Sequence, residues 1–273
     1  MRRPIHSSGE LLPAIGLGTY QSFNAGSSES RRETLREVLR LFTGENGSLI
    51  DSSPMYGSSE RVVGALSTEL DLRPQLFMAT KVWTRGERDG VEQMNESFRK
   101  MHVEVMDLMQ VHNLVDWRTH AKTLDEWKQQ GRIRYTGVTH YHSGAYGNLE
   151  SIMKLKRFDF AQFNYSIIER EAELRLLPLA LDTGTAVIVN RPFGAGGLFS
   201  RVHGVALPTW AAEFDCQSWA QFFLKYVISH PAVTCAIPAT GNPKHLVDNM
   251  AAGYGKLPDE ATRKRMRELI DTL

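Results

Sequence analysis

The 273-residue sequence has few cysteines, no long apolar run and no excess of either charge. Its two cysteines, Cys216 and Cys235, cannot build a disulfide framework and lack CxxC spacing, so we expect both to stay reduced. No apolar stretch reaches the roughly 18 residues that cross a bilayer, which argues against a membrane protein. Lysine plus arginine number 32 and aspartate plus glutamate 31. This balance argues against a nucleic-acid-binding surface.

The sequence also shows no linker composition and no metal-ligand pattern. Two arginines follow Met1 without an apolar segment behind them, so we expect no secretory signal and a cytoplasmic location. No Ser/Gly-rich or low-complexity tract divides the chain, and we expect one domain over residues 1–273, acting as a monomer or weak oligomer. The histidines do not show metal-ligand spacing, and no metal is expected.

Short apolar runs alternate with amphipathic stretches eight times along the chain. The runs cover residues 14–20, 48–53, 76–83, 105–114, 134–141, 160–166, 186–193 and 233–240. Each precedes a stretch with helical periodicity; in the first of these, Leu35, Val38, Leu39 and Phe42 share one face. Strands that alternate with helices predict parallel pairing through right-handed crossovers. Eight such units in a chain of this length predict a (β/α)8 TIM barrel.

Three further features refine the predicted barrel. A doubly wound sheet is the structural alternative, but the first strand carries GLGTY rather than the GxGxxG fingerprint of that fold. Residues 5–15 predict a β-hairpin that caps the barrel floor, and residues 258–273 predict an extra C-terminal helix. We expect short loops after the third, fourth and seventh strands.

Four ionisable residues fall at the carboxyl ends of three consecutive predicted strands, where barrel enzymes carry their chemistry. Asp51 ends the second strand, and Tyr56 lies in the turn that follows it. Lys81 ends the third strand and His112 the fourth. Each residue alone has an ordinary explanation, such as a helix cap for Asp51 or a solvated strand end for Lys81. Their placement on neighbouring strands favours a shared site.

These four side chains suit proton donation to an oxyanion. A tyrosine hydroxyl is a weak acid, and a lysine ammonium beside Tyr56 stabilises the phenolate and acts to lower its pKa. A carboxylate at Asp51 keeps Lys81 charged and in place. A histidine on the next strand can hydrogen-bond a carbonyl and orient it. The set therefore suits protonation of the oxyanion that forms when a hydride reaches a carbonyl.

Eight short motifs, in order and at barrel spacing, resemble those of the aldo-keto reductase family. They are GLGT, D-x4-YG-x2-E, ATK, D-x4-H, GV-x2-Y, QFNYS, RPFGAGGL and IPAT-x2-P-x-HL-x2-N. The sequence is similar to a short, bacterial-type member of that family along essentially its whole length. The resemblance implies a barrel that reduces small carbonyl compounds with NADPH, or with NADH. It also implies Tyr56 as general acid, Lys81 and Asp51 as the residues that tune it, and His112 as the carbonyl-orienting residue.

The same resemblance implies a cofactor-binding set. Thr139, His140 and Gln162 would hold the nicotinamide carboxamide, Gly18 and Thr19 would line the site floor, and Asn249 would face the adenine. The strand-end and loop residues that complete the set are Asn190, Arg191, Pro192, Phe193, Gly194, Ala239, Thr240 and His245.

The sequence departs from the family pattern in the cofactor region. Thr139 and His140 stand where Ser-Asn is common, and Asn190 and Arg191 stand where many members stack an aromatic ring on the nicotinamide. Arg191 either stacks on a ring or meets an anionic group, or else it forms an outward salt bridge with Glu169 or Glu171.

Past the eighth strand, Ala239 and His245 occupy positions where the family commonly has lysine and arginine around the 2'-phosphate. We therefore expect a weak preference for NADPH over NADH.

Two other functions remain open at this stage. One is a barrel that binds nucleotide without efficient turnover and regulates or binds a partner. The other is a cofactor-free lyase or isomerase that uses the Lys/Tyr pair. Retention of Asp51, Tyr56, Lys81 and His112 together favours the reductase.

Overall fold

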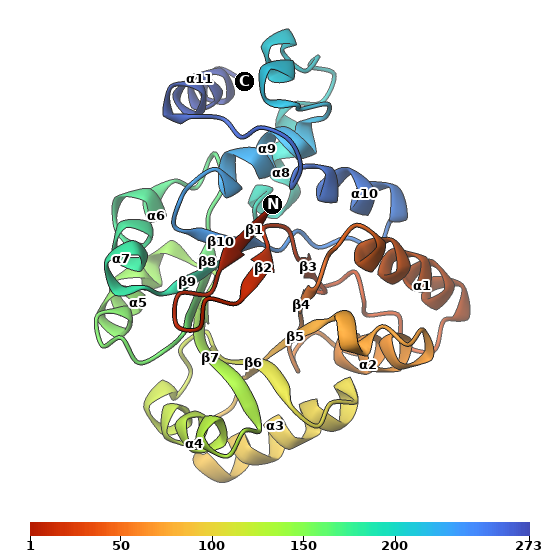
Figure 1. The fold of residues 1–273 in the computed structure, drawn as a ribbon, viewed down its shortest axis with the longest axis vertical. Helices are drawn as coiled ribbons and strands as arrows, with labels where there is room; N and C mark the ends of the chain where they lie inside the picture. Colours follow the sequence, from red (N-terminus) through yellow and green to blue (C-terminus); the bar gives the residue numbers. More distant parts are fainter.

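The computed structural model describes residues 1–273 and contains one barrel of eight parallel strands (Figure 1). Spatial order follows chain order: β3 (Leu17–Gly18), β4 (Leu49–Asp51), β5 (Phe77–Val82), β6 (Met106–His112), β7 (Ile133–His140), β8 (Phe160–Asn164), β9 (Ala186–Asn190) and β10 (Val233–Ala236). Parallel bridges from Ile15 to Ala236 and from Gly18 to Ala239 join the last strand to the first. The expected (β/α)8 barrel is confirmed.

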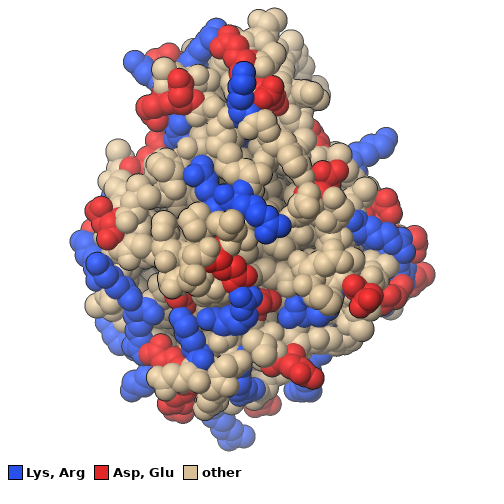
Figure 2. Space-filling model, in the orientation of Figure 1, with Lys and Arg blue, Asp and Glu red and all other residues tan.

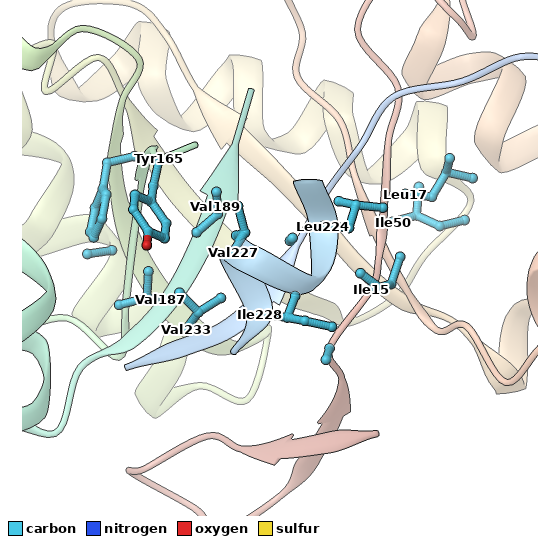
Figure 3. Close-up of a cluster of buried hydrophobic side chains, with 14 of the residues drawn as sticks. Ile15, Leu17, Ile50, Tyr165, Val187, Val189, Leu224, Val227, Ile228 and Val233 are labelled. Atoms are coloured by element: carbon cyan, nitrogen blue, oxygen red, sulfur yellow. The ribbon is translucent and has the colours of Figure 1, made fainter. Parts of the chain in front are cut away.

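A helix follows each barrel strand and covers its outer face. These helices are α1 (Glu29–Gly44), α2 (Ser59–Glu69), α3 (Glu87–Met101), α4 (Trp117–Gln129), α5 (Tyr146–Met153), α7 (Leu176–Thr183), α9 (Trp219–Ile228) and α10 (Pro243–Ala251). In α1 the buried side chains are Leu35, Val38, Leu39 and Phe42, the face that the periodicity predicts. Figure 3 shows a comparable contact, in which α9 packs its apolar side chains against β9.

Alternate residues of each strand face the barrel interior, because strand side chains point to opposite faces. On β5, Phe77 and Ala79 belong to the interior cluster, whereas Met78 and Val82 belong to the helix-facing core. The hairpin of β1 (Arg2–Pro4) and β2 (Leu11–Pro13) crosses the middle of the ring of strands in Figure 1 and closes the end of the barrel at which the strands begin. Its Ile5 and Leu12 join the interior cluster with the first residues of several strands, which confirms the expected hairpin.

The extra C-terminal helix is also confirmed as α11 (Glu260–Asp271). The Asp259 carboxylate accepts the Thr262 N–H at 2.8 Å and caps its first turn. Arg263 of α11 is buried and donates to Glu173 at 2.6 Å, within α6 (Glu171–Leu174). This ion pair, in which Arg263 is buried and Glu173 partly exposed, holds the helix against the outside of the barrel.

One expected loop length is wrong. The segments after β5 and β6 are short, spanning residues 83–86 and 113–116. The segment after β9 instead runs over residues 191–218 and contains α8 (Gly197–Arg201) and a 3-10 helix at Thr209–Phe214. Leu198, Ala211 and Phe214 of this segment are buried, so it packs as a small extension of the fold.

Acidic and basic side chains are interspersed on the face seen in Figure 2. None of the helices has both the length and the apolar composition needed to span a bilayer.

Candidate active site

The barrel brings Asp51, Lys81 and His112 together at the carboxyl ends of adjacent strands. Asp51 is the last residue of β4 and pairs in register with Ala79, two residues before Lys81 on β5. Lys81 pairs with Gln110, two residues before His112, the last residue of β6. The three side chains therefore share the inward-facing rows of neighbouring strands.

Lys81 and Asp51 form a buried ion pair. The Lys81 Nζ donates to Asp51 Oδ2 at 2.6 Å and to the Ser52 carbonyl oxygen at 2.6 Å. Lys81 is 0% exposed and Asp51 is 2% exposed. Burial acts to lower the pKa of Lys81, but the Asp51 carboxylate opposes it and the pKa lies above its ordinary value. Lys81 is therefore a fixed cation inside the barrel.

Two glutamines extend this pair, and sequence reasoning missed one of them. Gln110 Nε2 lies 3.2 Å from Asp51 Oδ1 and 2.8 Å from Gln162 Oε1. Gln162 Nε2 lies 3.4 Å from Asp51 Oδ2. Gln162, expected at the nicotinamide, thus also lies beside the Asp51 carboxylate. The alternation of β6 could have identified Gln110, because it shares the inward row with His112.

Tyr56 lies in the turn between β4 and α2, with its ring beside the lysine. The Lys81 Nζ is 5.2 Å from the ring centroid of Tyr56. The Tyr56 ring also makes edge contacts with Tyr20, at 5.0 Å between centroids, and with His112, at 5.9 Å. Burial raises the pKa of Tyr56 above its ordinary value, while the charge of Lys81 acts in the opposite direction. Lys81 therefore acts to lower this pKa, as expected, but burial outweighs its effect.

His112 is a neutral imidazole. Burial, followed by the positive charge of Lys81, lowers the pKa of His112 to about 2. Its Nδ1 lies 3.0 Å from Ser53 Oγ, and its ring lies 6.4 Å from that of Trp83. Neutral imidazole has one N–H donor and one acceptor, so it can donate a hydrogen bond to a carbonyl without carrying charge.

Gly18 and Thr19 lie next to the closure of the barrel, and Thr19 contacts the chain at Asp51 and Ser52. The Thr19 Oγ1 donates to the Asp51 carbonyl oxygen at 3.0 Å and lies 3.0 Å from Ser52 Oγ. A Cβ on Gly18 would lie 2.8 Å from the Ile237 carbonyl oxygen, so only glycine fits this approach of β3 to the last strand.

The expected nicotinamide-binding residues lie on the next strand ends of the same rim. Thr139 is buried near the end of β7, and the partly buried His140 is its last residue. Burial lowers the pKa of His140. At the end of β9, the Oδ1 of Asn190 is buried and accepts no hydrogen bond within the protein.

Arg191 has a positive φ of 53° and an exposed side chain. Its guanidinium carbon lies 5.7 Å from the ring centroid of Tyr141, an exposed tyrosine that stacks on His140. No ion pair joins it to Glu169 or Glu171. The structure therefore favours the stacked arrangement over the outward salt bridge.

The remaining expected cofactor residues lie in two loops. Pro192, Phe193 and Gly194 begin the segment after β9, and Phe193 packs on Phe199 at 4.8 Å between ring centroids. After β10, Ala239 is exposed and Thr240 is buried.

Helix α10 begins next to this second loop. Its N-cap is Asn242, whose Oδ1 accepts the Lys244 N–H at 2.9 Å. His245 is exposed on α10, while Asn249 is buried there. The two expected cofactor residues on α10 thus differ in their access to solvent.

The structure resembles solved aldo-keto reductases. An aldo/keto reductase from Klebsiella pneumoniae, in complex with NADP and acetate, superimposes with a TM-score of 0.79 at 24% identity, over 96% of this chain and 93% of that one. An aldo-keto reductase from Bacillus halodurans in its holo form gives a TM-score of 0.80 at 21% identity, over 98% and 95%. At these identities the likeness concerns the fold.

Curated relatives carry reductase names. Aldo-keto reductase YhdN of Bacillus subtilis is 30% identical over 65% of this chain and 57% of its own length. Methylglyoxal reductase DkgA of Yersinia pestis is 29% identical over 49% of this chain and 47% of its own length, so these two matches span about half of each relative. The NADH-specific methylglyoxal reductase of Escherichia coli is 27% identical over 99% of this chain and 98% of its own length.

A family model described as the aldo/keto reductase family matches residues 14–270. That match covers nearly the whole barrel, including all four strand-end residues described above. The chain therefore belongs to the aldo/keto reductase family of oxidoreductases.

Proposed function

We propose that the protein reduces small aldehydes and ketones with NADPH, or with NADH, and that Tyr56 is the proton donor. The observation that carries this proposal is the fully buried Lys81, which is ion-paired with Asp51 at 2.6 Å and lies 5.2 Å from the Tyr56 ring centroid. Burying a lysine charge is costly unless the charge is paired, as it is here with Asp51, and buried charges with perturbed pKa values cluster at functional sites.

Each of the four residues has a distinct part in the proposed reaction. Tyr56 donates its proton to the carbonyl oxygen as the alcohol forms. Lys81 stabilises the phenolate that remains, and Asp51 holds Lys81 in position. His112 donates a hydrogen bond to the same oxygen and orients the carbonyl. A bound reduced nicotinamide would supply the hydride.

The residues at the strand ends fit a nicotinamide nucleotide. The Asn190 Oδ1 is a buried acceptor without a partner, and a carboxamide or hydroxyl group could donate to it. Thr139 and His140 offer further hydrogen-bonding groups on β7, two strands away from Asn190. The capped N-terminus of α10 lies next to Thr240 and favours a phosphate group. We propose that these residues hold the cofactor, and that residues 1–273 act as one domain.

The proposed substrates are small carbonyl compounds. Two exposed aromatic side chains lie beside the proposed acid and the histidine, Tyr20 next to Tyr56 and Trp83 next to His112. Such side chains offer flat apolar contacts rather than charged ones. Relatives from Escherichia coli and Yersinia pestis are named methylglyoxal reductases, so methylglyoxal is the first substrate to test.

Cofactor titration followed by turnover tests the proposal. NADPH should quench the tryptophan fluorescence of the purified protein saturably, and methylglyoxal or an aryl aldehyde should then cause loss of nicotinamide absorbance. Binding without turnover on any carbonyl would favour a nucleotide-binding regulatory barrel. No binding of either NADPH or NADH would refute the proposed function.

A further inference from the structure

Ser53 lies in the turn after β4, and its hydroxyl contacts the catalytic histidine. The Ser53 Oγ is 3.0 Å from His112 Nδ1, and Ser53 is 0% exposed. The backbone N–H of Met55 points at the same oxygen, at 3.4 Å. These are the two hydrogen-bond contacts of the Ser53 hydroxyl in the structure.

The hydrogen-bond partners of Ser53 determine which way the contact with His112 runs. A backbone amide can only donate, so Ser53 Oγ accepts from Met55. If His112 Nδ1 also donated, the Ser53 O–H would be a buried donor without an acceptor, which is disfavoured. If the Ser53 O–H donates to Nδ1, then the Met55 N–H, the Ser53 hydroxyl and His112 Nδ1 each have a hydrogen-bond partner. The second arrangement is therefore the more stable one.

The His112 ring carries one proton, because burial and Lys81 keep it neutral. With Nδ1 accepting from Ser53, that proton resides on Nε2. The Nε2 makes no hydrogen bond within the protein and is not among the fully buried atoms that lack a partner. It is thus the ring nitrogen left free to meet a ligand.

We propose that Ser53 is a positioning residue whose hydroxyl donates to Nδ1 of His112 and so keeps the ring proton on Nε2, where it can donate to the substrate carbonyl. The catalytic part of this inference rests on the proposed reductase function; the assignment of the tautomer does not. In the opposite tautomer, Nε2 would present a lone pair to the carbonyl oxygen and repel it.

Nitrogen NMR of the full chain tests the tautomer directly. Uniformly 15N-labelled protein at neutral pH should give His112 ring signals with a pyridine-type shift for Nδ1 and a pyrrole-type shift for Nε2. The His112→Gln variant assigns these signals by their loss. The reverse pattern, or a ring averaged between the two tautomers in the unmodified protein, would overturn the proposal.

Removing the Ser53 hydroxyl by substitution tests the consequence for activity. Ser53→Ala should move both His112 nitrogen shifts toward the average of the two tautomers. It should also lower kcat/KM for methylglyoxal about tenfold, the effect of one hydrogen bond, while the Kd for NADPH stays the same. Ser53→Thr, which keeps the hydroxyl, should restore the shifts and most of the activity. Unchanged nitrogen shifts or an unchanged kcat/KM in Ser53→Ala would overturn the proposal.

A matched control removes an equally buried serine hydroxyl elsewhere. Ser67, on α2, is 0% exposed and donates to the Gly64 carbonyl oxygen at 3.1 Å. Ser67→Ala should change neither the His112 shifts nor kcat/KM. If the unmodified protein reduced no carbonyl compound at all, the proposed function would fail. The nitrogen shifts would still show whether Ser53 sets the tautomer of the His112 ring.

Discussion

Replacing Lys81 by methionine removes the cation at the centre of the site and leaves a buried carboxylate behind. Asp51 would lose its 2.6 Å partner and keep only the amide groups of Gln110 and Gln162, at 3.2 and 3.4 Å. Breaking a buried ion pair on one side costs about 3–5 kcal/mol. For a chain of this size that loss corresponds to a fall in Tm of roughly 10 °C.

Activity should fall in the same variant for a separate reason. Without Lys81 no cation stabilises the phenolate of Tyr56, and we expect turnover to drop by about 10²–10⁴-fold. Reduction requires Tyr56 to hold its proton, so the rate falls as pH rises through its pKa. Because the charge of Lys81 lowers that pKa, its removal moves the alkaline limb of the pH–rate profile to higher pH.

A double variant separates the two effects. Lys81→Met with Asp51→Asn removes both charges, so it should recover at least half of the lost Tm while activity stays low. Thermal unfolding and steady-state NADPH oxidation measure the two quantities on the same samples. The reasoning is refuted if Lys81→Met is as stable as the unmodified protein, or if the double variant is no more stable than the single one.

Three further predictions concern the closure of the barrel, the C-terminal helix and the cofactor. Gly18→Ala should destabilise the fold by about 1–3 kcal/mol, because its Cβ would press on the Ile237 carbonyl oxygen. Gly44→Ala is the control and should not destabilise the fold, because a Cβ there meets no atom within 4 Å. Urea unfolding measures the free energy of unfolding of both variants. Arg263→Met should cost about 1–3 kcal/mol in the same assay, since Glu173 of α6 loses its 2.6 Å partner and keeps Arg267 at 4.0 Å and the hydroxyl groups of Tyr165 and Tyr226. KM values should show NADPH preferred over NADH by only about tenfold, because Ala239 and His245 stand where the family commonly has lysine and arginine around the 2'-phosphate; a clear NADH preference would contradict this.

The strand ends of the site could be predicted from the sequence because barrel geometry places them. Asp51, Lys81 and His112 each end an apolar run, and consecutive parallel strands are neighbours in a barrel. The structure places them on adjacent strands as expected. The interior row also contains Gln110, which was missed because a glutamine inside an apolar strand carries no motif of its own.

Other features depend on three-dimensional detail that a linear pattern does not hold. The role of Ser53 depends on the backbone path of one turn, which aims its hydroxyl at His112. The net direction of the Tyr56 pKa depends on how deeply the ring is buried, and burial outweighs Lys81. The segment over residues 191–218 was expected to be short because its helices are brief and show little periodicity.

The most direct test of the account is the rate of carbonyl reduction by Tyr56→Phe. This change removes one hydroxyl and keeps the ring that contacts Tyr20 and His112. We predict that turnover of methylglyoxal falls by about 10²–10⁴-fold while the Kd for NADPH changes little. Tyr254→Phe is the matched control, since Tyr254 is exposed and donates to the Glu45 carbonyl away from the site, and it should keep full activity. Turnover by Tyr56→Phe close to that of the unmodified protein would contradict the central claim.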